Sequence, residues 1–308
     1  MCGIVGLYLK NDALHGQLGE LFAPMLTQMS ERGPDSAGIA VYREDSNTSR
    51  VAGSRQWCKV TIHSALDDPE WPALVQRAQA ALNIDIEFNV LATHAVLQAN
   101  CAAAQLRAWL ESARADLRIM SSGSALEIYK GVGRPSDVLT RFTIDSMSGS
   151  HMIGHTRMAT ESAVSTAGAH PFNTGDDLCL VHNGSLSNHN RLRAWLRDHA
   201  GVTFQTQNDS EVAAGYLTWR LSQGMAIKAA LEAALDDLDG FYTFAVGTRD
   251  GFSVLRDPIA CKPAVMAETD DWVAMASEFR ALAALPGVNN ASVWEPEPAT
   301  VYSWGRIA

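Results

Sequence analysis

The first residues of the chain, Met1-Cys2-Gly3-Ile4-Val5-Gly6, constrain its fold more than any other stretch. Apolar side chains continue as far as Leu9, a pattern typical of a strand buried in a core. Chain termini are usually disordered. A terminal sequence with the character of a core strand therefore indicates that this end of the chain is held in place.

Cys2 is the chemically distinctive residue of that stretch. Removal of Met1 would leave Cys2 with a free α-amine, whose pKa in model peptides is roughly 7.7–8.0. Such an amine can take the proton of the thiol on the same residue, so that one residue supplies both nucleophile and base. The alternative is a start methionine followed by an ordinary buried cysteine, and the first six residues alone leave both interpretations open.

Composition limits the classes of protein to which the chain can belong. Its 308 residues allow one large domain or two ordinary ones. The net charge of -10 argues against nucleic acid or an anionic membrane as the main partner. Five widely spaced cysteines without a CxxC pair favour a reducing cytoplasm over a disulfide framework or a zinc site. No signal peptide is evident and no apolar run approaches ~20 residues, so no membrane span is expected.

Hydrophobic periodicity predicts a mixed α+β chain. Helices are expected at 18–29, 71–82, 102–117, 188–199, 210–221, 226–235 and 278–285. Strands are expected at 3–9, 38–42, 57–62, 84–96, 152–157, 178–182, 241–246, 252–255, 264–266, 272–276 and 300–304, with a hairpin that pairs 117–120 with 125–129. This order suits sheets packed face to face with helices outside.

Polar clusters occupy the expected strand ends, where loops present chemistry. They lie at 32–38, 154–160, 170–172, 181–188 and 208–211. Each cluster taken singly has a structural explanation. Arg32 and Asp35 could form an ion pair at a helix end, Asn183-Gly184 could be a turn, and Asp209 could cap a helix.

Together with Cys2, these clusters resemble the class II, or N-terminal nucleophile (Ntn), glutamine amidotransferases. That family carries a CGI(V/F)G start, an RGxDSxG segment, a GHxRxAT segment, an HNG turn and a DSE segment, and all five occur here in this order. The resemblance implies a four-layer αββα sandwich over residues 2–308. The long interval between Asp35 and Gly154 implies an inserted α/β segment at about 57–115.

The resemblance also implies catalytic roles. Cys2 would attack the carboxamide carbon of glutamine, while its own α-amine moves the proton. The side-chain amide of Asn183 and the backbone N–H of Gly184 would stabilise the tetrahedral oxyanion. Ammonia would leave, and water would hydrolyse the thioester. The expected products are glutamate and ammonia.

Substrate binding is implied for three further residues. Arg157 would bind the α-carboxylate of glutamine through its guanidinium, and Thr160 would add a hydroxyl. Asp209 would bind the α-ammonium. Three more residues are expected to form a lid or to support the site: Arg32, Asp35 and His170. The candidate lid is the loop 32–38, with Gly33 and Gly38 as hinges.

Some features depart from the family pattern or suggest other chemistry. Glu161 stands where many relatives have histidine, and Ala260 replaces the glycine of the RDPxGxKP segment. His151 and His155 have the spacing of a helical metal pair, but they lie on an expected strand without a third ligand, so no metal site is predicted. Residues 131–136 begin like a dinucleotide-binding loop but lack its third glycine.

The amidotransferase pattern occupies the whole chain, so the acceptor of ammonia is expected on another polypeptide. The stand-alone format resembles the amidotransferase subunit of glutamate-synthase-like complexes, and among these it most resembles the subunit of N-methylglutamate synthase. In such complexes FMN and iron–sulfur clusters belong to partner subunits, and no cofactor is expected in this chain. Two alternatives remain: an N-terminal-cysteine amidase acting on a different amide, and a catalytically silent regulatory subunit.

Overall fold

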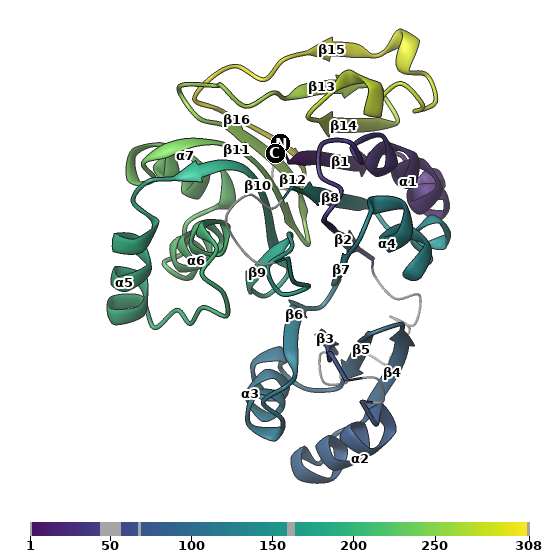
Figure 1. The fold of residues 1–308 in the computed structure, drawn as a ribbon, viewed down its shortest axis with the longest axis vertical. Coiled ribbons are helices and arrows are strands. Elements are labelled where there is room, and N and C mark those ends of the chain that lie inside the picture. Colours follow the sequence, from purple (N-terminus) through teal and green to yellow (C-terminus); the bar gives the residue numbers. More distant parts are fainter. Residues whose placement is uncertain (1, 44–56, 67–68, 159–163, 307–308) are drawn as a thin grey trace.

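A computed structural model describes residues 2–43, 57–66, 69–158 and 164–306 of the chain. Two antiparallel sheets lie face to face, and helices cover the outer face of each (Figure 1). This is the predicted α+β fold with four layers in the order αββα. Among the described residues, no helix is both long and apolar enough to cross a membrane.

The first sheet has seven strands in the order β15-β13-β14-β1-β8-β2-β7. Their bounds are β1 Gly3–Leu9, β2 Ser36–Tyr42, β7 Leu126–Val132, β8 His151–Arg157, β13 Val265–Glu268, β14 Trp272–Ala276 and β15 Ser292–Trp294. The strand that begins the chain, β1, lies at the centre of this sheet. Its register pairs Gly3 with Thr156 on one side and Val5 with Ala276 on the other.

The second sheet has five strands in the order β16-β12-β11-β10-β9. Their bounds are β9 Phe172–Gly175, β10 Leu178–Leu186, β11 Gly240–Thr248, β12 Gly251–Arg256 and β16 Thr300–Gly305. The inner faces of the two sheets enclose one apolar cluster, to which Ile4 and Val181 belong. A hydrogen bond from Nε2 of His151 to the carbonyl oxygen of Thr248 (3.0 Å) joins the sheets.

Helices complete the outer layers. Helix α1 (Leu18–Gln28) and helix α4 (Pro135–Arg141) pack on the seven-stranded sheet, and α5 (His189–Ala200), α6 (Asp209–Ser222) and α7 (Ile227–Asp237) pack on the five-stranded sheet. Alternate residues of β1 therefore enter different cores: Val5 and Leu7 pack on the α1 side, and Ile4 packs between the sheets. Burial on both faces explains why this strand is apolar at nearly every position.

Residues 58–123 build a further unit that lies apart from the four layers (Figure 1). It is a four-stranded sheet in the order β4-β5-β3-β6, packed with two helices over its own apolar cluster. Its elements are β3 Cys58–His63, α2 Trp71–Leu82, β4 Ile86–Leu91, β5 His94–Ala99, α3 Ala103–Ala113 and β6 Arg118–Gly123. The segment expected at about 57–115 supplies most of this unit, and β6 extends it.

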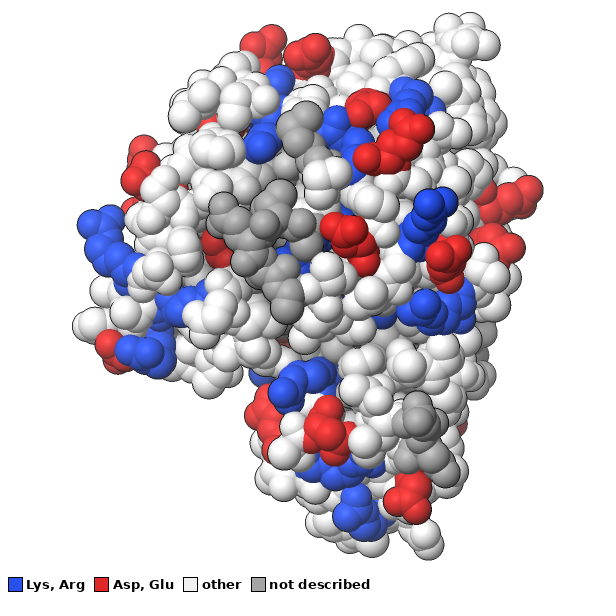
Figure 2. All heavy atoms as spheres, in the orientation of Figure 1, with Lys and Arg blue, Asp and Glu red and all other residues white. Residues whose placement is uncertain are grey.

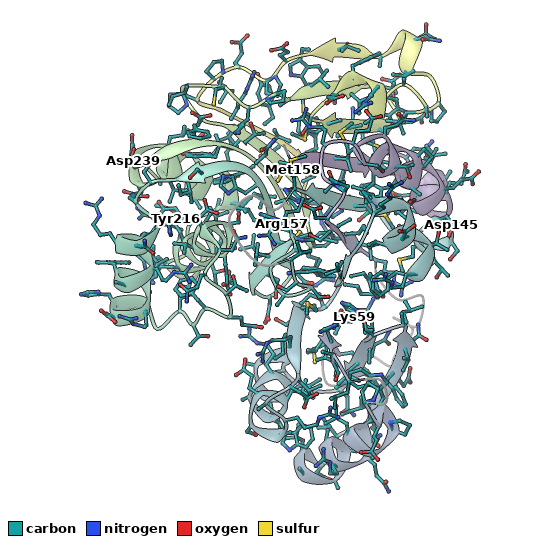
Figure 3. All side chains as sticks on the ribbon, viewed as in Figure 1. Lys59, Asp145, Arg157, Met158, Tyr216 and Asp239 are labelled. Atoms are coloured by element: carbon teal, nitrogen blue, oxygen red, sulfur yellow. The ribbon has the colours of Figure 1, made fainter. Side chains whose placement is uncertain are left out.

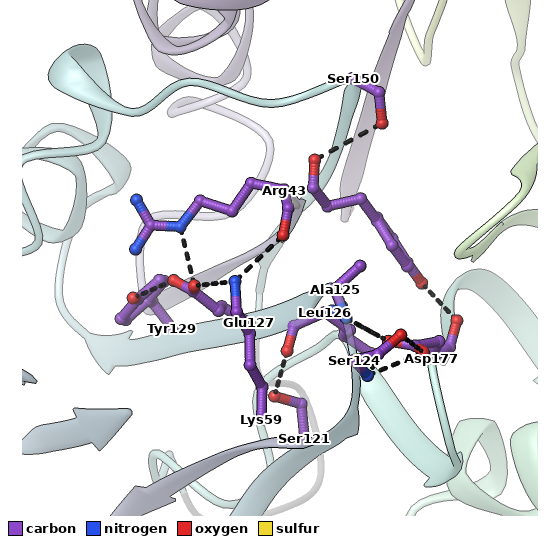
Figure 4. Close-up of polar contacts among 11 residues, drawn as sticks. Arg43, Lys59, Ser121, Ser124, Ala125, Leu126, Glu127, Tyr129, Ser150 and Asp177 are labelled. Atoms are coloured by element: carbon purple, nitrogen blue, oxygen red, sulfur yellow. Dashed lines mark hydrogen bonds and ion pairs between the residues drawn. The ribbon is translucent and has the colours of Figure 1, made fainter. Parts of the chain in front are cut away.

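A buried ionic network joins this unit to the seven-stranded sheet (Figure 4). Nζ of Lys59 on β3 donates to a carboxylate oxygen of Glu127 on β7 (3.1 Å), and Nε of Arg43 donates to the same oxygen (2.7 Å). The hydroxyl of Tyr129 donates to the second oxygen (2.7 Å). Burial raises the pKa of the Glu127 carboxyl, but Lys59 and Arg43 outweigh it, so the pKa lies below its ordinary value.

Two strand predictions in this region are wrong. The stretch 84–96 is not one strand but the hairpin β4–β5, which turns at Ala92 with a φ of 51°. The turn residues, Ala92 and Thr93, include no glycine, proline or asparagine to signal it. The segments 117–120 and 125–129 do not pair with each other. Strand β6 pairs with β3, and β7 pairs with β2, so the chain passes from one sheet to another between them.

The carboxylate of Asp177 stabilises that passage, because it accepts hydrogen bonds from the backbone N–H groups of Ser124, Ala125 and Leu126 (2.8–3.0 Å).

The prediction of a helix at 278–285 is also wrong, since only a 3₁₀ turn at Phe279–Ala281 forms there. Helix α4 and strands β9 and β15 were not predicted. All three are short, and their periodicity is weak over so few residues.

Candidate active site

Cys2 immediately precedes β1 and lies where the two large sheets meet. Because Gly3 pairs with Thr156, the register sets Cys2 beside the end of β8. The carbonyl oxygen of Cys2 accepts hydrogen bonds from Nε of Arg32 (3.0 Å) and from Nδ2 of Asn183 on β10 (3.2 Å). Cys2 remains partly exposed. Its backbone is thus held from two sides.

Gly184 follows Asn183 on β10 and has a φ of +152°. A Cβ atom at this position would lie 2.0 Å from the carbonyl oxygen of Phe241, so only glycine fits. The side-chain amide of Asn183 contacts Cys2, and Gly184 is the next residue of β10. The sequence predicted both residues here.

Arg32 connects Cys2 to Glu278. Its Nη1 donates to a carboxylate oxygen of Glu278 (2.6 Å), and Glu278 also pairs with Arg280 (2.7 Å). The hydrogen bond from Arg32 is the main reason that the pKa of Glu278 lies below its ordinary value. Glu278 received no role from the sequence, although it belongs to the Ala276-Ser277-Glu278 segment that continues the family pattern.

The hinge predicted at Gly38 is wrong. Gly38 lies inside β2, hydrogen-bonded between β7 and β8, and cannot open. Gly33 is wedged against β8, where a Cβ atom would come within 2.4 Å of the backbone carbon of Thr156. Asp35 is held there as well, because its backbone N–H donates to the carbonyl oxygen of Arg157 (3.1 Å).

The two predicted charge-binding residues come from a strand and a helix. Arg157 ends β8 near the centre of the molecule (Figure 3), is 8% exposed, and donates from Nη1 to the carbonyl oxygen of Gly168 (3.2 Å). Asp209 begins α6, and its carboxylate accepts the backbone N–H of Leu186 (2.9 Å). Thr160 lies outside the described residues.

A buried group of three histidines lies between them. Ser210 Oγ is 2.7 Å from Nε2 of His170 and 2.8 Å from Nδ1 of His182. His155 stacks on His170, with ring centroids 4.0 Å apart, and donates from Nε2 to the carbonyl oxygen of His182 (3.1 Å). Asp209 adjoins the group, since its Oδ1 is 3.7 Å from Nδ1 of His182. The histidines therefore connect β8, β10 and α6 under the site.

These histidines are neutral because burial dominates their titration. Burial lowers the pKa of His155 to about 3, and it lowers the pKa of His170 and of His182, the last against the opposing effect of Asp209. Within the described parts of the chain, no three metal-ligating side chains converge on a common point. His170 was expected to support the site, and its hydrogen bond to Ser210 is consistent with that.

Sequence reasoning gave no role to Ser210, His155 or His182, although each lies in a quoted motif. The alternation of side chains along a strand could have indicated one of these residues. His155 and Arg157 are two residues apart on β8 and therefore point to the same face. The partner of each histidine comes from another element, and no spacing within one motif indicates such a contact.

The fold and the site together define the class of protein. A four-layer αββα sandwich with a cysteine at the start of a central strand, a side-chain amide beside it and opposite charges nearby is the arrangement of an Ntn amidotransferase. A family model described as a glutamine amidotransferase domain matches residues 155–284.

Known proteins agree with this class. The chain is 57% identical to "Glutamine amidotransferase-like protein GlxB" of Rhizobium meliloti over 305 residues, which are 99% of this chain and 98% of that protein. It is 29% identical to a "Putative glutamine amidotransferase" of Methanothermobacter thermautotrophicus, across 98% of this chain and 99% of that one. The chain therefore belongs to the class II glutamine amidotransferases.

A solved structure shares the fold. The glutamine phosphoribosylpyrophosphate amidotransferase from B. subtilis, complexed with ADP and GMP, aligns with a TM-score of 0.61 at 20% identity. The match covers 99% of this chain and 47% of that one. It shows similarity of fold over a part of the larger protein.

The buried histidines predict acid sensitivity. Between pH 6.5, the ordinary pKa of histidine, and about 3, unfolded chains bind a proton at His155 that the native protein does not. The free energy of unfolding should therefore fall as the pH falls through this range, by about 1.4 kcal/mol per pH unit for this residue. Urea unfolding at a series of pH values should show a shallower slope for His155→Gln than for wild type. Equal slopes would contradict the assignment.

Proposed function

We propose that this chain hydrolyses L-glutamine to L-glutamate and ammonia through a thioester on Cys2, and that ammonia passes to a synthase partner on another polypeptide. The observation that carries the chemistry is the contact between Asn183 Nδ2 and the carbonyl oxygen of Cys2 (3.2 Å), which puts an amide donor beside the nucleophilic residue. Family membership supports glutamine as the substrate. We expect the reaction in the cytoplasm, as the cysteine content predicts.

In the proposed first step, removal of Met1 exposes the α-amine of Cys2, which takes the thiol proton. The thiolate attacks the carboxamide carbon, and a tetrahedral oxyanion forms. Nδ2 of Asn183 and the backbone N–H of Gly184 donate to that oxygen. The C–N bond then breaks, ammonia departs with the proton held by the α-amine, and a γ-glutamyl thioester remains on Cys2.

In the second step, the α-amine of Cys2 accepts a proton from water, and the water oxygen attacks the thioester carbon. The same oxyanion donors serve again. Collapse of this intermediate breaks the C–S bond and returns the proton to the thiol. Glutamate is released, so one water is consumed for each glutamine and no electrons are transferred.

Substrate selection follows from charge in this proposal. Arg157 binds the α-carboxylate and Asp209 the α-ammonium, with Thr160 as a further contact. Arg32 supports Cys2, because its Nε donates to the carbonyl oxygen of Cys2. Asp35 supports the end of β8, because its backbone N–H donates to the carbonyl oxygen of Arg157. A pair of opposite charges that recognises an amino acid favours glutamine over an amide without these groups.

The partner is inferred from the extent of the relatives. The chain covers 98% of the GlxB protein of Rhizobium meliloti, whereas it covers 21% of a "Glutamine--fructose-6-phosphate aminotransferase [isomerizing]" of Xylella fastidiosa. Relatives thus exist in which the amidotransferase region makes up almost the whole protein. We propose a glutamate-synthase-like complex, with N-methylglutamate synthase as the nearest case and with FMN and iron–sulfur clusters on the partner subunits.

Replacement of the nucleophile tests the chemistry. Cys2→Ala should abolish glutamine hydrolysis, because no other group can form the thioester, while circular dichroism stays as in wild type. Cys101→Ala, in the unit at 58–123, is the matched control and should retain activity. Mass spectrometry of active protein should show that Met1 is absent. Full activity with Met1 in place would exclude the α-amine as base.

Replacement of the charge-binding residues tests the substrate. Arg157→Lys and Asp209→Asn should each raise KM for glutamine about 10- to 100-fold, since each variant loses a hydrogen bond to a charged group. Steady-state kinetics with glutamine measure this. Unchanged KM values in both variants would favour the alternative of an amidase acting on a different amide.

Co-purification tests the partner. A C-terminally tagged chain isolated from its native cell should bring down a flavin-containing polypeptide, and glutamine hydrolysis should rise several-fold when that partner and its acceptor are added. Spectra of the complex would reveal the flavin. A chain that purifies alone, with full activity and no response to other polypeptides of the cell, would leave glutamine hydrolysis as its only reaction.

A further inference from the structure

A cleft separates the unit at 58–123 from helix α6, on a side of the protein to which no role has been given. Figure 2 shows the molecule indented between the lower lobe, formed by residues 58–123, and the lobe that carries α5 and α6. The cleft has a volume of about 650 Å³, within the range of sites that bind small molecules. Its walls come from α3, β6, α6 and residues 200–205.

Positive charge lines the outer part of this cleft. It contains the guanidinium groups of Arg107, Arg114 and Arg118, although the protein as a whole carries a net charge of -10. Arg114 pairs with Asp116. Across the described residues, neither Arg107 nor Arg118 forms an ion pair, and Arg118 donates only to backbone carbonyl oxygens (3.1 and 3.2 Å).

The two acidic side chains that line the cleft, Glu111 and Glu211, form no ion pair with Arg107 or Arg118 among the described residues. Glu111 lies exposed at the surface of α3. Glu211 is buried, and its carboxylate already accepts the backbone N–H groups of Gln205 (2.6 Å) and Thr206 (2.8 Å) and the hydroxyl of Thr206 (2.7 Å). An anion that enters the cleft would therefore meet guanidinium groups that still lack an acidic partner.

A small pocket that adjoins the cleft holds a buried cation, Lys130. This pocket of about 20 Å³ shares Ile119, Asn173, Gln205 and Glu211 with the cleft and is also lined by Lys130. This residue is 4% exposed, and its Nζ lies 4.6 Å from the centre of the Phe172 ring. Where the chain is described, that ammonium group has no hydrogen bond or ion pair. The pocket has room for about one water or one ligand oxygen.

A buried ammonium group that has no hydrogen bond or ion pair among the described residues is costly, and its titration reflects that. Burial lowers the pKa of Lys130 to about 7, against opposing effects of Glu211 and Cys179. The other titratable groups whose pKa Lys130 affects are histidines, and each of their pKa values is lowered: His63, His94 and His170. An anion beside Nζ would offset the cost of burial and favour the protonated amine.

We propose that this cleft binds a small molecule that carries a carboxylate or phosphate group, with one anionic oxygen on Lys130 and the others on Arg107 and Arg118. Hydrogen bonds between charged groups are the strongest available for this recognition. The site is separate from the glutamine site, because its lining includes neither Cys2, Asn183, Arg157 nor Asp209.

Helix α6 links the two sites through consecutive residues. Asp209 adjoins His182, Ser210 bonds to His170 and His182, and Glu211 lines the cleft. A ligand that moves Glu211 or the backbone it holds at Gln205 therefore acts on Asp209 through one turn of helix. This coupling rests on the proposed role of Asp209 in glutamine binding, whereas binding in the cleft does not.

The test is isothermal titration calorimetry of the full-length protein with three probes: inorganic phosphate, pyrophosphate and citrate. At least one should bind with saturation at constant ionic strength, and the comparison of citrate with the two phosphates distinguishes a carboxylate ligand from a phosphate ligand. Lys130→Met and Arg107→Gln should each weaken that binding by about 10- to 100-fold. Lys228→Met, on the exposed face of α7, is the matched control and should bind as wild type does.

Two further measurements distinguish binding in the cleft from its coupling to the glutamine site. Titrations at pH 7 in buffers of different ionisation enthalpy should show that wild type takes up more protons per bound probe than Lys130→Met does with the same probe. The bound probe should also change KM for glutamine. Absence of saturable binding by all three probes, or wild-type affinity in both Lys130→Met and Arg107→Gln, would overturn the site. Binding with an unchanged KM would overturn only the coupling, and an unaffected KM in Asp209→Asn would instead reject the role of Asp209.

Discussion

The pairing of β1 on both of its edges is the constraint on which the rest of this structure depends. Strand β8 lies on one side and β14 on the other, and both faces of β1 are buried. A chain end so enclosed has lost most of its conformational freedom before any substrate arrives. Asn183 and Arg32 then need only to hold the carbonyl oxygen of Cys2 to fix the position of the residue.

Much of the fold followed from local sequence, and the failures have physical causes. Strand 3–9, helix 71–82 and strand 272–276 were predicted with the bounds that the structure has, because their apolar residues are dense and regular. The error at 117–129 arose because two adjacent strands usually pair, whereas Asp177, more than fifty residues later, holds the chain as it crosses between sheets. Tertiary contacts of this kind leave no local signal.

The candidate site also has one part that the sequence predicted and one part that it did not. Residues that contact substrate in the proposed mechanism lie within recognisable motifs, and their order along the chain was enough to suggest them. The support beneath them was not predictable, because it consists of contacts between motifs: Ser210 with His170 and His182, and Arg32 with Glu278. Three consecutive residues in the first turn of α6 illustrate this. Asp209 lies beside His182, Ser210 is within hydrogen-bond distance of His170 and His182, and Glu211 lines the separate cleft.

The position of β14 has a consequence for biosynthesis. The residues that complete the setting of Cys2 are Ala276, paired with Val5, and Ser277, whose hydroxyl accepts the backbone N–H of Ile4 (2.9 Å). They lie more than 270 residues from the start of the chain, and such long-range pairings form slowly because the intervening chain must first be ordered. While the ribosome is still making the protein, the amino-terminal cysteine emerges first but finds its second neighbouring strand almost last. A nascent chain that stops early therefore carries Cys2 without the complete sheet that orients it.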